Sequence, residues 1–398
     1  MIPRFFGLDT HKQFVMAAAV DPQQTLLQPP LRINMPQLES WAANTLTRED
    51  TVVIEVTTNT WQLHKLLSQY AGEVVVANPY KTKLIAEARI KSDKVDAIAL
   101  AQLLASRFIA EVWVPDPETQ QHRHLAAHRA TLVRQRTQIK NRLQALLTRH
   151  NLPCPHKSLF TQEGRQWLTQ QPFPLVAQLE CQHWLRQLQV LDEDIHETER
   201  LIALLAVADD RVPRLMQLTG IGVFTAFAIL AQIGDIHRFP SPKKLASFAG
   251  LAPSLHQSGN RSYNGHITKA GSPMLRWLLV EAARIAVRFD PHWQAIYDRL
   301  KAQRGANIAA VAVARKLLVV IWHLLHDQST YRFLCPQTYV TKLQQWARLI
   351  GRKHLPVASS REFVEQQLQR VQLAHLTQSI ISTQKGNLKV QFRNFHQT

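Results

Sequence analysis

Apolar and polar positions alternate with strand-like and helix-like periods over the first 115 residues. Short apolar runs predict strands at residues 5–9, 14–20, 26–33, 51–55 and 73–77. Helical spacing is present at residues 36–46, 60–70 and 92–106. Residues 112–114 are the last segment in this series of strand and helix signals. Ser92 stands at the position of an N-cap for the third of these helices. Strands followed by strand–helix alternation predict an α/β sheet with helices packed on it.

The pattern changes after residue 117. Residues 118–150 contain no Gly or Pro, and their apolar positions mostly follow a step of seven. A second helical pattern occupies residues 179–206. We therefore predict a helical hairpin or coiled-coil arm over residues 117–206. Its arginine-rich first helix favours an arm that dimerises or contacts nucleic acid, and an ordinary helical spacer is the alternative.

The remainder of the chain divides into two further parts. Residues 207–330 are predicted to be mostly helical, with a polar, glycine-containing interruption at residues 254–272. Residues 331–398 are polar and basic, with a helical pattern at residues 360–373. The predicted domains are thus an α/β domain (1–116), an arm (117–206), a helical domain (207–330) and a basic C-terminal extension (331–398).

The distribution of charge along the chain indicates the kind of partner it binds. Lys and Arg total 47 against 29 for Asp and Glu, a net charge of +18. The excess is uneven, because residues 1–115 hold 11 basic and 11 acidic residues, whereas residues 331–398 hold 10 and 2. A neutral domain joined to basic ones indicates a polyanionic partner, and nucleic acid is the commonest.

Other features limit the protein class. The three cysteines are far apart and form no CxxC pair, so neither a disulfide framework nor a zinc site is indicated. No signal peptide is visible. The longest apolar run, residues 311–325, is interrupted by Arg315 and Lys316. We therefore expect a cytoplasmic protein that is associated with nucleic acid and not with a membrane.

Four carboxylates of the first domain occupy positions where they can meet. Asp9 and Glu55 end two predicted strands, and Asp93 and Asp96 lie three residues apart on one helix. Strand ends converge at one edge of such a sheet, so these acids are candidates for a Mg²⁺ site that acts on phosphodiesters. Taken singly, each acid is more commonly a turn or helix-start residue.

Two segments of the helical domain carry further candidates. Gly220 and Gly222 separate two apolar helical segments, as in a DNA-binding helical hairpin or a simple tight turn. Ser258 precedes Gly259 in the polar interruption, which predicts a flexible, accessible loop. Basic residues that could neutralise a phosphate lie nearby: Lys243, Lys244, Arg261, Lys269 and Arg276. From composition alone, Ser258 is an ordinary loop serine.

These ordered motifs resemble a known family. The sequence is similar to DEDD-type transposases of insertion sequences, which include bridge-RNA-guided recombinases and are related to Piv-type DNA invertases. The N-terminal motifs are Gly7-Leu8-Asp9-Thr10-His11-Lys12, Glu55-Val56-Thr57-Thr58-Asn59-Thr60-Trp61, Val75-Val76-Ala77-Asn78-Pro79 and Lys91-Ser92-Asp93-Lys94-Val95-Asp96-Ala97. The C-terminal motifs include Thr219-Gly220-Ile221-Gly222, Phe248-Ala249-Gly250-Leu251-Ala252-Pro253, Gln257-Ser258-Gly259 and Ala314-Arg315-Lys316-Leu317-Leu318.

The resemblance implies a RuvC-like (RNase H-like) N-terminal domain, a coiled-coil middle and a helical transposase domain. It implies that Asp9, Glu55, Asp93 and Asp96 hold Mg²⁺ and that Ser258 is a nucleophile that links covalently to DNA. It also implies a homodimer or homotetramer, and a noncoding guide RNA encoded by the element.

Three alternatives stay open at this stage. A Mg²⁺-dependent, Holliday-junction-type nuclease would use the carboxylates and leave Ser258 idle. A DNA invertase would perform the same strand exchange on a flanking segment. A non-catalytic DNA-binding relic is opposed by the presence of all four acids and Ser258.

Overall fold

Five strands form one mixed sheet in the order β3-β2-β1-β4-β5. They are β1 (Phe5–Thr10), β2 (Phe14–Val20), β3 (Leu26–Asn34), β4 (Thr51–Glu55) and β5 (Glu73–Ala77). β1 pairs antiparallel with β2 and parallel with β4, and β4 pairs parallel with β5. The structure is a computed structural model that describes residues 3–85, 92–258, 261–382 and 388–390. The predicted strands and the α/β class of this region are confirmed.

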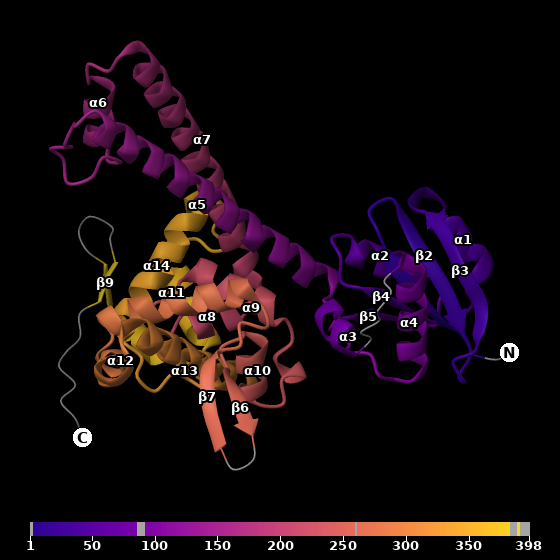
Figure 1. The fold of residues 1–398 in the computed structure, drawn as a ribbon. Helices are drawn as coiled ribbons and strands as arrows, with labels where there is room; N and C mark the ends of the chain where they lie inside the picture. The colour runs from indigo at the N-terminus through magenta and orange to yellow at the C-terminus, as the bar shows by residue number, and fades with distance from the viewer. Residues whose placement is uncertain (1–2, 86–91, 259–260, 383–387, 391–398) are drawn as a thin grey trace. The chain divides into compact units, whose positions relative to one another are not determined.

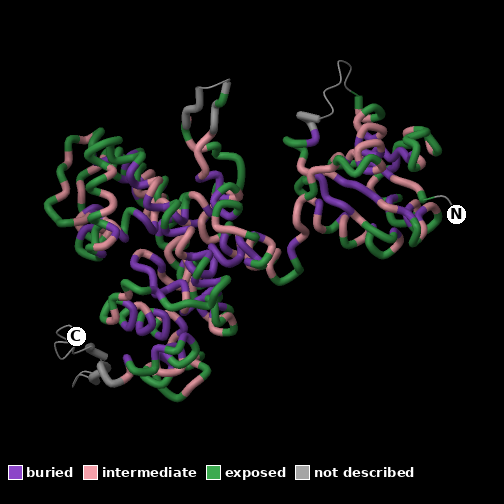
Figure 2. Tube along the Cα trace, turned by 90° about the horizontal axis from the view of Figure 1, so that it is seen from below, coloured by how far each residue is buried: buried purple, intermediate pink, exposed green. Residues whose placement is uncertain are grey.

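Helices cover both faces of the sheet. They are the 3₁₀ turn η1 (Met35–Gln37) and the helices α1 (Leu38–Thr45), α2 (Thr60–Leu67), α3 (Pro79–Ile85) and α4 (Asp93–Ala105). Phe6 and Leu8 of β1 share one hydrophobic cluster with α1 and α2, whereas Val53 of β4 packs with α4 on the other face. Burial runs along the central strands (Figure 2). The sheet is thus the middle of three layers, and α4 alone covers much of one face.

The structure departs from the predicted series of elements at two places in this region. Residues 112–114 form no regular strand, and the only pairing described there is an isolated bridge between Ala77 and Glu111. α3 was missed, because its sequence begins with Pro79 and carries two lysines and little apolar periodicity. Ser92 does cap α4, where its hydroxyl accepts a hydrogen bond from the Val95 amide at 3.4 Å.

An ion pair fixes the start of the sheet. The Asp50 carboxylate is buried and accepts hydrogen bonds from Arg4 at 2.6 and 2.8 Å and from the Thr47 amide at 2.7 Å. Burial on its own raises the pKa of Asp50, but the hydrogen bonds from Arg4 and Thr47 outweigh it and hold the pKa below its usual value. Asp50 therefore stabilises the folded state only while it is ionised.

Replacing Asp50 by Ala is expected to lower the free energy of unfolding by about 2–4 kcal/mol, because it leaves Arg4 half-buried without its partner. In the wild type, this stabilisation is present above the unfolded-state pKa and is lost as the pH falls through the lower folded-state pKa. Chemical denaturation between pH 3 and pH 7 checks both points. An Asp50→Ala variant with the same acid dependence as the wild type would contradict the assignment.

The remainder of the chain, residues 117–398, forms a second compact unit that is mostly helical. Its helices are α5 (Pro117–Arg149), α6 (Gln162–Thr169), α7 (Leu175–Leu205), α8 (Arg211–Leu215), α9 (Val223–Ile233), α10 (Pro242–Phe248), α11 (Pro273–Phe289), α12 (Pro291–Arg304), α13 (Ala306–His326), α14 (Pro336–Ile350) and α15 (Ser360–Arg370). Its strands are β6 (Pro253–Ser258), β7 (Arg261–Ile267), β8 (Ile380–Ser382) and β9 (Leu388–Val390). Short 3₁₀ turns lie at Ala206–Ala208, Ile236–Arg238, Arg352–His354 and Ala374–Ser379. The predicted helical character of the remainder is confirmed.

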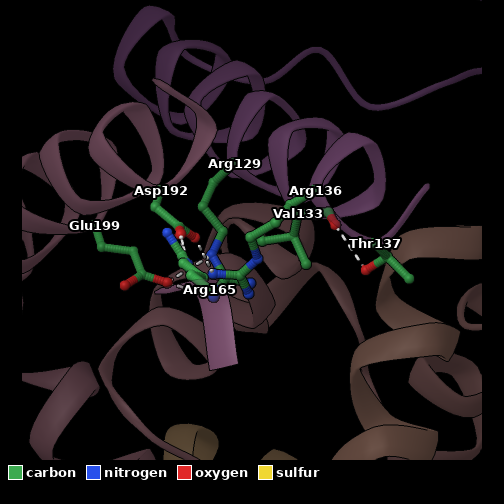
Figure 3. Close-up of polar contacts among 7 residues, drawn as sticks. All are labelled: Arg129, Val133, Arg136, Thr137, Arg165, Asp192 and Glu199. Atoms are coloured by element: carbon green, nitrogen blue, oxygen red, sulfur yellow. Dashed lines mark hydrogen bonds and ion pairs between the residues drawn. The ribbon is translucent and has the colours of Figure 1, made fainter. Parts of the chain in front are cut away.

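The long helices α5 and α7 lie side by side as an antiparallel hairpin, with α6 near its far end (Figure 1). Apolar side chains close the seam, including Ile139 and Leu143 of α5 and Leu188 of α7. Ion pairs flank this seam. Arg129 pairs with Glu199, and Asp192 pairs with both Arg136 and Arg165 (Figure 3). The predicted hairpin is present, and its description as a coiled coil stays a prediction.

One core fills the rest of the second unit. Helix α13 runs through this core, where its Leu317 and Ile321 are buried. Among the described residues, α13 is the one helix that is long and apolar enough to cross a membrane, but over half of its apolar stretch is buried inside the protein. Tyr339 and Trp346 of α14 and Phe363 of α15 are buried in the same cluster. The segment after residue 330 therefore contributes to the core, and its boundary as a separate basic extension stays a prediction.

The polar interruption of the helical region is a hairpin. β6 and β7 pair antiparallel, with Ser258 opposite Arg261, and the hairpin extends from the helices around it (Figure 1). Ser258 therefore ends a strand where the sequence predicted a loop, and the predicted flexibility and accessibility stay predictions. The hairpin escaped prediction because its strands carry few apolar residues to alternate with polar ones.

Candidate functional site

Asp9 and Glu55 lie beside each other on neighbouring strands. Leu8 pairs with Ile54 in the parallel register, so the next residues of β1 and β4 are Asp9 and Glu55. Because side chains alternate along a strand, both acids share the face of Gly7 and Val53. Val53 packs against α4 on that face. The two acids therefore lie at the carboxyl ends of parallel strands, on the face that α4 covers.

Gly7 lets α4 approach the sheet closely. A Cβ atom at Gly7 would lie 2.2 Å from the carbonyl oxygen of Ala97 and 2.4 Å from the amide nitrogen of Ala101. Only a residue without a side chain fits at this crossing. Asp93 and Asp96 lie in the first turn of α4, just before the crossing point. The glycine therefore brings the helix acids toward Asp9.

Asp9, His11 and Asp93 form a compact group. Each offers one ligand atom, and these atoms all lie within 4.8 Å of one another. The His11 Nε2 atom is 3.0 Å from Asp9 Oδ2 and 3.4 Å from Asp93 Oδ2. All three side chains are half-buried at the edge of the sheet. The structure thus unites two of the four predicted acids with a histidine.

The electrostatics of Asp9 indicate a site that favours a cation. Burial raises its pKa, and the negative charges of Asp93 and Asp96 raise it further, while His11 opposes the shift. Asp96 is therefore close enough to interact with Asp9, although it stands outside the compact group. Clustered carboxylates that repel each other and carry hard oxygen donors suit a divalent cation. The residues present fit such an ion.

His11 was not among the predicted site residues. It lies two residues after Asp9, beyond the end of β1, and its ring also stacks on Phe14 at 4.5 Å between centroids. A histidine that follows a candidate metal-binding acid at this spacing was a signal in the sequence. Its ring nitrogen can orient the Asp9 carboxylate or donate directly to a cation.

The serine hairpin lies in the second unit. Ser258 is the last residue of β6 and Arg261 the first of β7. Gly259, which followed Ser258 in the predicted motif, lies outside the described residues, as does Lys91 of the N-terminal motif. The backbone pairing holds Ser258 near the end of the hairpin, next to a basic residue in register.

The two glycines of the predicted nucleic-acid turn differ in structure. Gly220 has φ +88°, and a Cβ atom there would lie 2.3 Å from the Ala282 carbonyl oxygen of α11. Gly222 precedes α9, and no atom lies within 4 Å of its Cβ position. The half-buried ammonium of Lys342 donates hydrogen bonds to the carbonyls of Met216, Leu218 and Ile221 in this turn. Gly220 thus serves internal packing, while no atom crowds the Cβ position of Gly222.

The predicted basic residues also divide into two kinds. Lys243 and Lys244 are exposed in the first turn of α10, and Lys269 is exposed with φ +54°. Arg276 instead donates hydrogen bonds to the carbonyls of Ala249 at 3.1 Å and Lys269 at 3.3 Å. The lysines are therefore accessible to a phosphate, whereas Arg276 fastens α11 to the base of the hairpin.

Comparison with known proteins identifies the family. Residues 6–152 match the model of a DEDD transposase of the IS110 type, and residues 212–298 match the model of the IS116/IS110/IS902 transposase family. The chain is 33% identical to a transposase for insertion sequence element IS1111A of Coxiella burnetii over 61% of this chain and 68% of the relative. It is 32% identical to a probable family 20 transposase of Pseudomonas aeruginosa over 61% of this chain and 74% of the relative.

The chain belongs to the IS110/IS116 family of insertion-sequence transposases. A putative transposase of Sinorhizobium fredii, 26% identical, extends the similarity to 82% of this chain and 85% of the relative. This transposase is accordingly an enzyme that acts on DNA. The two matched regions contain the acids around Asp9 and the segment from Gly220 to Ser258. The DEDD family and the Asp9 group are together compatible with a divalent metal.

For this transposase, the two glycines offer a matched pair of variants. Gly220→Ala is expected to lower the free energy of unfolding by about 2–4 kcal/mol, because it combines a positive φ with a clash against α11. Gly222→Ala is expected to leave stability unchanged and to weaken DNA binding about fivefold, since a methyl group would obstruct a phosphate at the start of α9. Thermal unfolding and DNA titration measure the two effects. Unchanged DNA affinity in Gly222→Ala would remove Gly222 from the interface.

Proposed function

We propose that this transposase cuts and rejoins the DNA strands of an insertion sequence with a Mg²⁺ site and a serine nucleophile. Asp9, Glu55, Asp93 and Asp96 hold the metal, and Ser258 attacks the DNA. The observation that carries the proposal is the convergence of carboxylates from β1, β4 and α4 at one edge of the sheet. The sheet order β3-β2-β1-β4-β5, with its antiparallel half and its parallel half, supports a RuvC-like domain.

The chain's own side chains would hold the metal in this proposal. Asp9 is the central residue of the group, because it contacts His11 and its pKa is raised by the charges of both helix acids, Asp93 and Asp96. When bound, Mg²⁺ would supply charge stabilisation to the oxygens of a reacting phosphodiester. His11 acts as a positioning residue that holds the Asp9 carboxylate by its 3.0 Å contact.

Ser258 supplies the covalent step. Its hydroxyl oxygen forms a bond to phosphorus, the bond from phosphorus to one sugar oxygen breaks, and the hydroxyl proton ends on the departing sugar oxygen. Rejoining reverses the step, since a sugar hydroxyl attacks the phosphoserine and releases Ser258. One phosphodiester bond is exchanged for another, so no ATP is needed. The exposed Lys243, Lys244 and Lys269, with Arg261, are proposed to hold DNA phosphates nearby.

The resemblance adds partners to the proposal. A noncoding RNA encoded by the element would select the DNA sites by base pairing, and the active enzyme would be a homodimer or homotetramer. The work would take place on chromosomal DNA in the cytoplasm.

The direct test uses the purified full-length chain and a plasmid that carries the element with its flanking DNA. In Mg²⁺ we expect strand cleavage, DNA that is covalently linked to protein, and rejoined products. All three should vanish in EDTA. Cleavage that leaves only free ends would favour the nuclease alternative. Covalent linkage and rejoining that persist in EDTA would overturn the metal assignment.

A further inference from the structure

Three backbone carbonyls of the turn that leads to Gly222 converge on one point. They belong to Met216, Leu218 and Ile221, which are all buried. The ammonium of Lys342 occupies this point and donates a hydrogen bond to each carbonyl, at 2.8 Å to Leu218 and 3.1 Å to Ile221. We refer to the three carbonyl oxygens as the carbonyl cage. Because a buried carbonyl without a partner costs free energy, the carbonyl cage requires a cation or a set of donors at its centre.

The number of acceptors in the carbonyl cage matches a charged group. An ammonium has three N–H donors, one for each carbonyl, whereas a neutral amine has two and would turn a lone pair toward the third oxygen. Burial lowers the pKa of Lys342 to about 7, and the three carbonyl oxygens oppose this shift because they stabilise the charged form. Rings of backbone carbonyls also replace the hydration shell of K⁺ in potassium channels. The carbonyl cage therefore has the chemistry of a monovalent-cation site.

Helix α14 fixes Lys342 in this position. One turn before it, the buried Tyr339 hydroxyl donates a hydrogen bond to the Pro213 carbonyl at 3.0 Å. One turn after it, the buried Trp346 indole donates a hydrogen bond to the Ala203 carbonyl at 2.9 Å. The three donors lie on one face of α14, since they are three and four residues apart. Lys342 is therefore held between two anchored neighbours, and its ammonium is part of the structure of the turn.

The carbonyl cage borders a cavity. Lys342 lines this cavity of about 370 Å³ together with Gly222 and Thr225 at the start of α9. A small ion can therefore enter from the cavity when the ammonium is removed.

The lysine and the turn belong to different parts of the family comparison. The turn lies within residues 212–298, which match the transposase family, whereas α14 lies outside both matched regions. The role of Lys342 therefore does not follow from membership of the family.

We propose that Lys342 is a tethered cation, whose ammonium fills a monovalent-cation site in the turn and thereby positions Gly222 at the start of α9. Without the ammonium, the carbonyl cage binds K⁺. Lys342 is a positioning residue, because it contacts the turn and acts on DNA only through it. Its effect on DNA affinity rests on the proposed DNA contact of Gly222, whereas its effect on the turn does not. Stability and DNA affinity are therefore measured separately.

Replacing Lys342 by Met tests the cation site. Methionine keeps most of the apolar stem and removes the ammonium, so the carbonyl cage is left empty. In choline chloride, Lys342→Met should melt at a lower temperature than the wild type. Exchanging choline for K⁺ at constant ionic strength should restore part of this loss along a single-site saturation curve. The wild type should not respond, because its site is filled, and neither should the matched control Lys353→Met, which removes an exposed lysine.

Lys342→Ala separates the loss of the cation from a packing defect. It leaves an ion more room, so its melting temperature should respond to K⁺ at least as strongly as that of Lys342→Met. If either variant is unfolded in choline, K⁺ should restore its circular dichroism. A loss of stability in both variants that K⁺ does not change would overturn the proposal and leave Lys342 a hydrogen-bonding clamp. A wild type that responds to K⁺ as strongly as the variants would overturn it too.

DNA titration at constant ionic strength tests the link to binding. In choline, Lys342→Met should bind DNA about tenfold more weakly than the wild type, and K⁺ should bring its affinity to within about twofold. Constant ionic strength is needed because salt alone weakens contacts with phosphates. Melting that depends on K⁺ with DNA affinity equal to that of the wild type would confirm the cation site and remove the turn from the DNA interface. The failure of the DNA contact is thereby distinguished from the failure of the cation site.

Discussion

Replacing Asp9 by Asn is expected to slow metal-dependent DNA cleavage by at least about 10³-fold, a loss of roughly 4 kcal/mol of transition-state stabilisation. Asp9 lies between His11 and Asp93 and interacts with Asp96, so it is the most central carboxylate of the group. Asparagine keeps its shape and removes its charge. The matched control is Glu73→Gln, an exposed acid at the opposite end of the same sheet. It should cleave DNA at the wild-type rate.

The same variant should keep or raise the stability of the metal-free protein. The folded-state pKa of Asp9 is raised, so ionising Asp9 costs folding free energy, and stability falls as the pH rises through the window above its usual pKa. Asparagine removes this cost at pH 7. Mg²⁺ should raise the melting temperature of the wild type and leave that of Asp9→Asn unchanged. If Asp9→Asn lost activity but had a lowered melting temperature and normal Mg²⁺ binding, Asp9 would be a structural residue and not a metal ligand.

The acidic group around Asp9 could be predicted largely from local pattern. Asp9 and Glu55 end apolar runs that are short enough to be strands, and parallel strands of one sheet end at one edge. The helix pair Asp93 and Asp96 follows from a three-residue spacing after a good N-cap, Ser92. Local pattern does not show how closely α4 approaches the sheet, because this distance depends on Gly7 of β1 and on the backbone of α4. The spacing of His11 from Asp9 was a signal in the sequence, but only the distances show that His11 belongs to the group.

The second unit was harder to predict, since its structure depends on contacts between distant segments. Tyr339, Trp346 and Phe363 belong to a segment that composition describes as basic and polar, yet all three are buried in the main helical core. Gly220 and Gly222 look equivalent in the sequence, and only the approach of α11 distinguishes them. The carbonyl cage was also hidden, because at least 121 residues separate the turn from the lysine that fills it.

Replacing Ser258 by Ala is expected to abolish covalent protein–DNA linkage, to below about 1% of the wild-type amount, because alanine has no oxygen to bond to phosphorus. Labelled DNA that runs with the protein on a denaturing gel, and is released by protease, measures the linkage. Ser247→Ala is the matched control, as it removes a serine hydroxyl on α10 that donates a hydrogen bond only to the Lys243 carbonyl in the described contacts. This control should leave linkage intact.

The two variants of the transposase separate the roles of its two units. Asp9→Asn should lose both cleavage and linkage, since the proposed metal site would serve every strand break. Ser258→Ala should lose linkage and rejoining together, because the broken bond is conserved only in the phosphoserine. Linkage that persists undiminished in Ser258→Ala would assign the nucleophile to another residue. Cleavage that continues with free ends would mean that water replaces Ser258, and that the carboxylates activate whichever oxygen attacks.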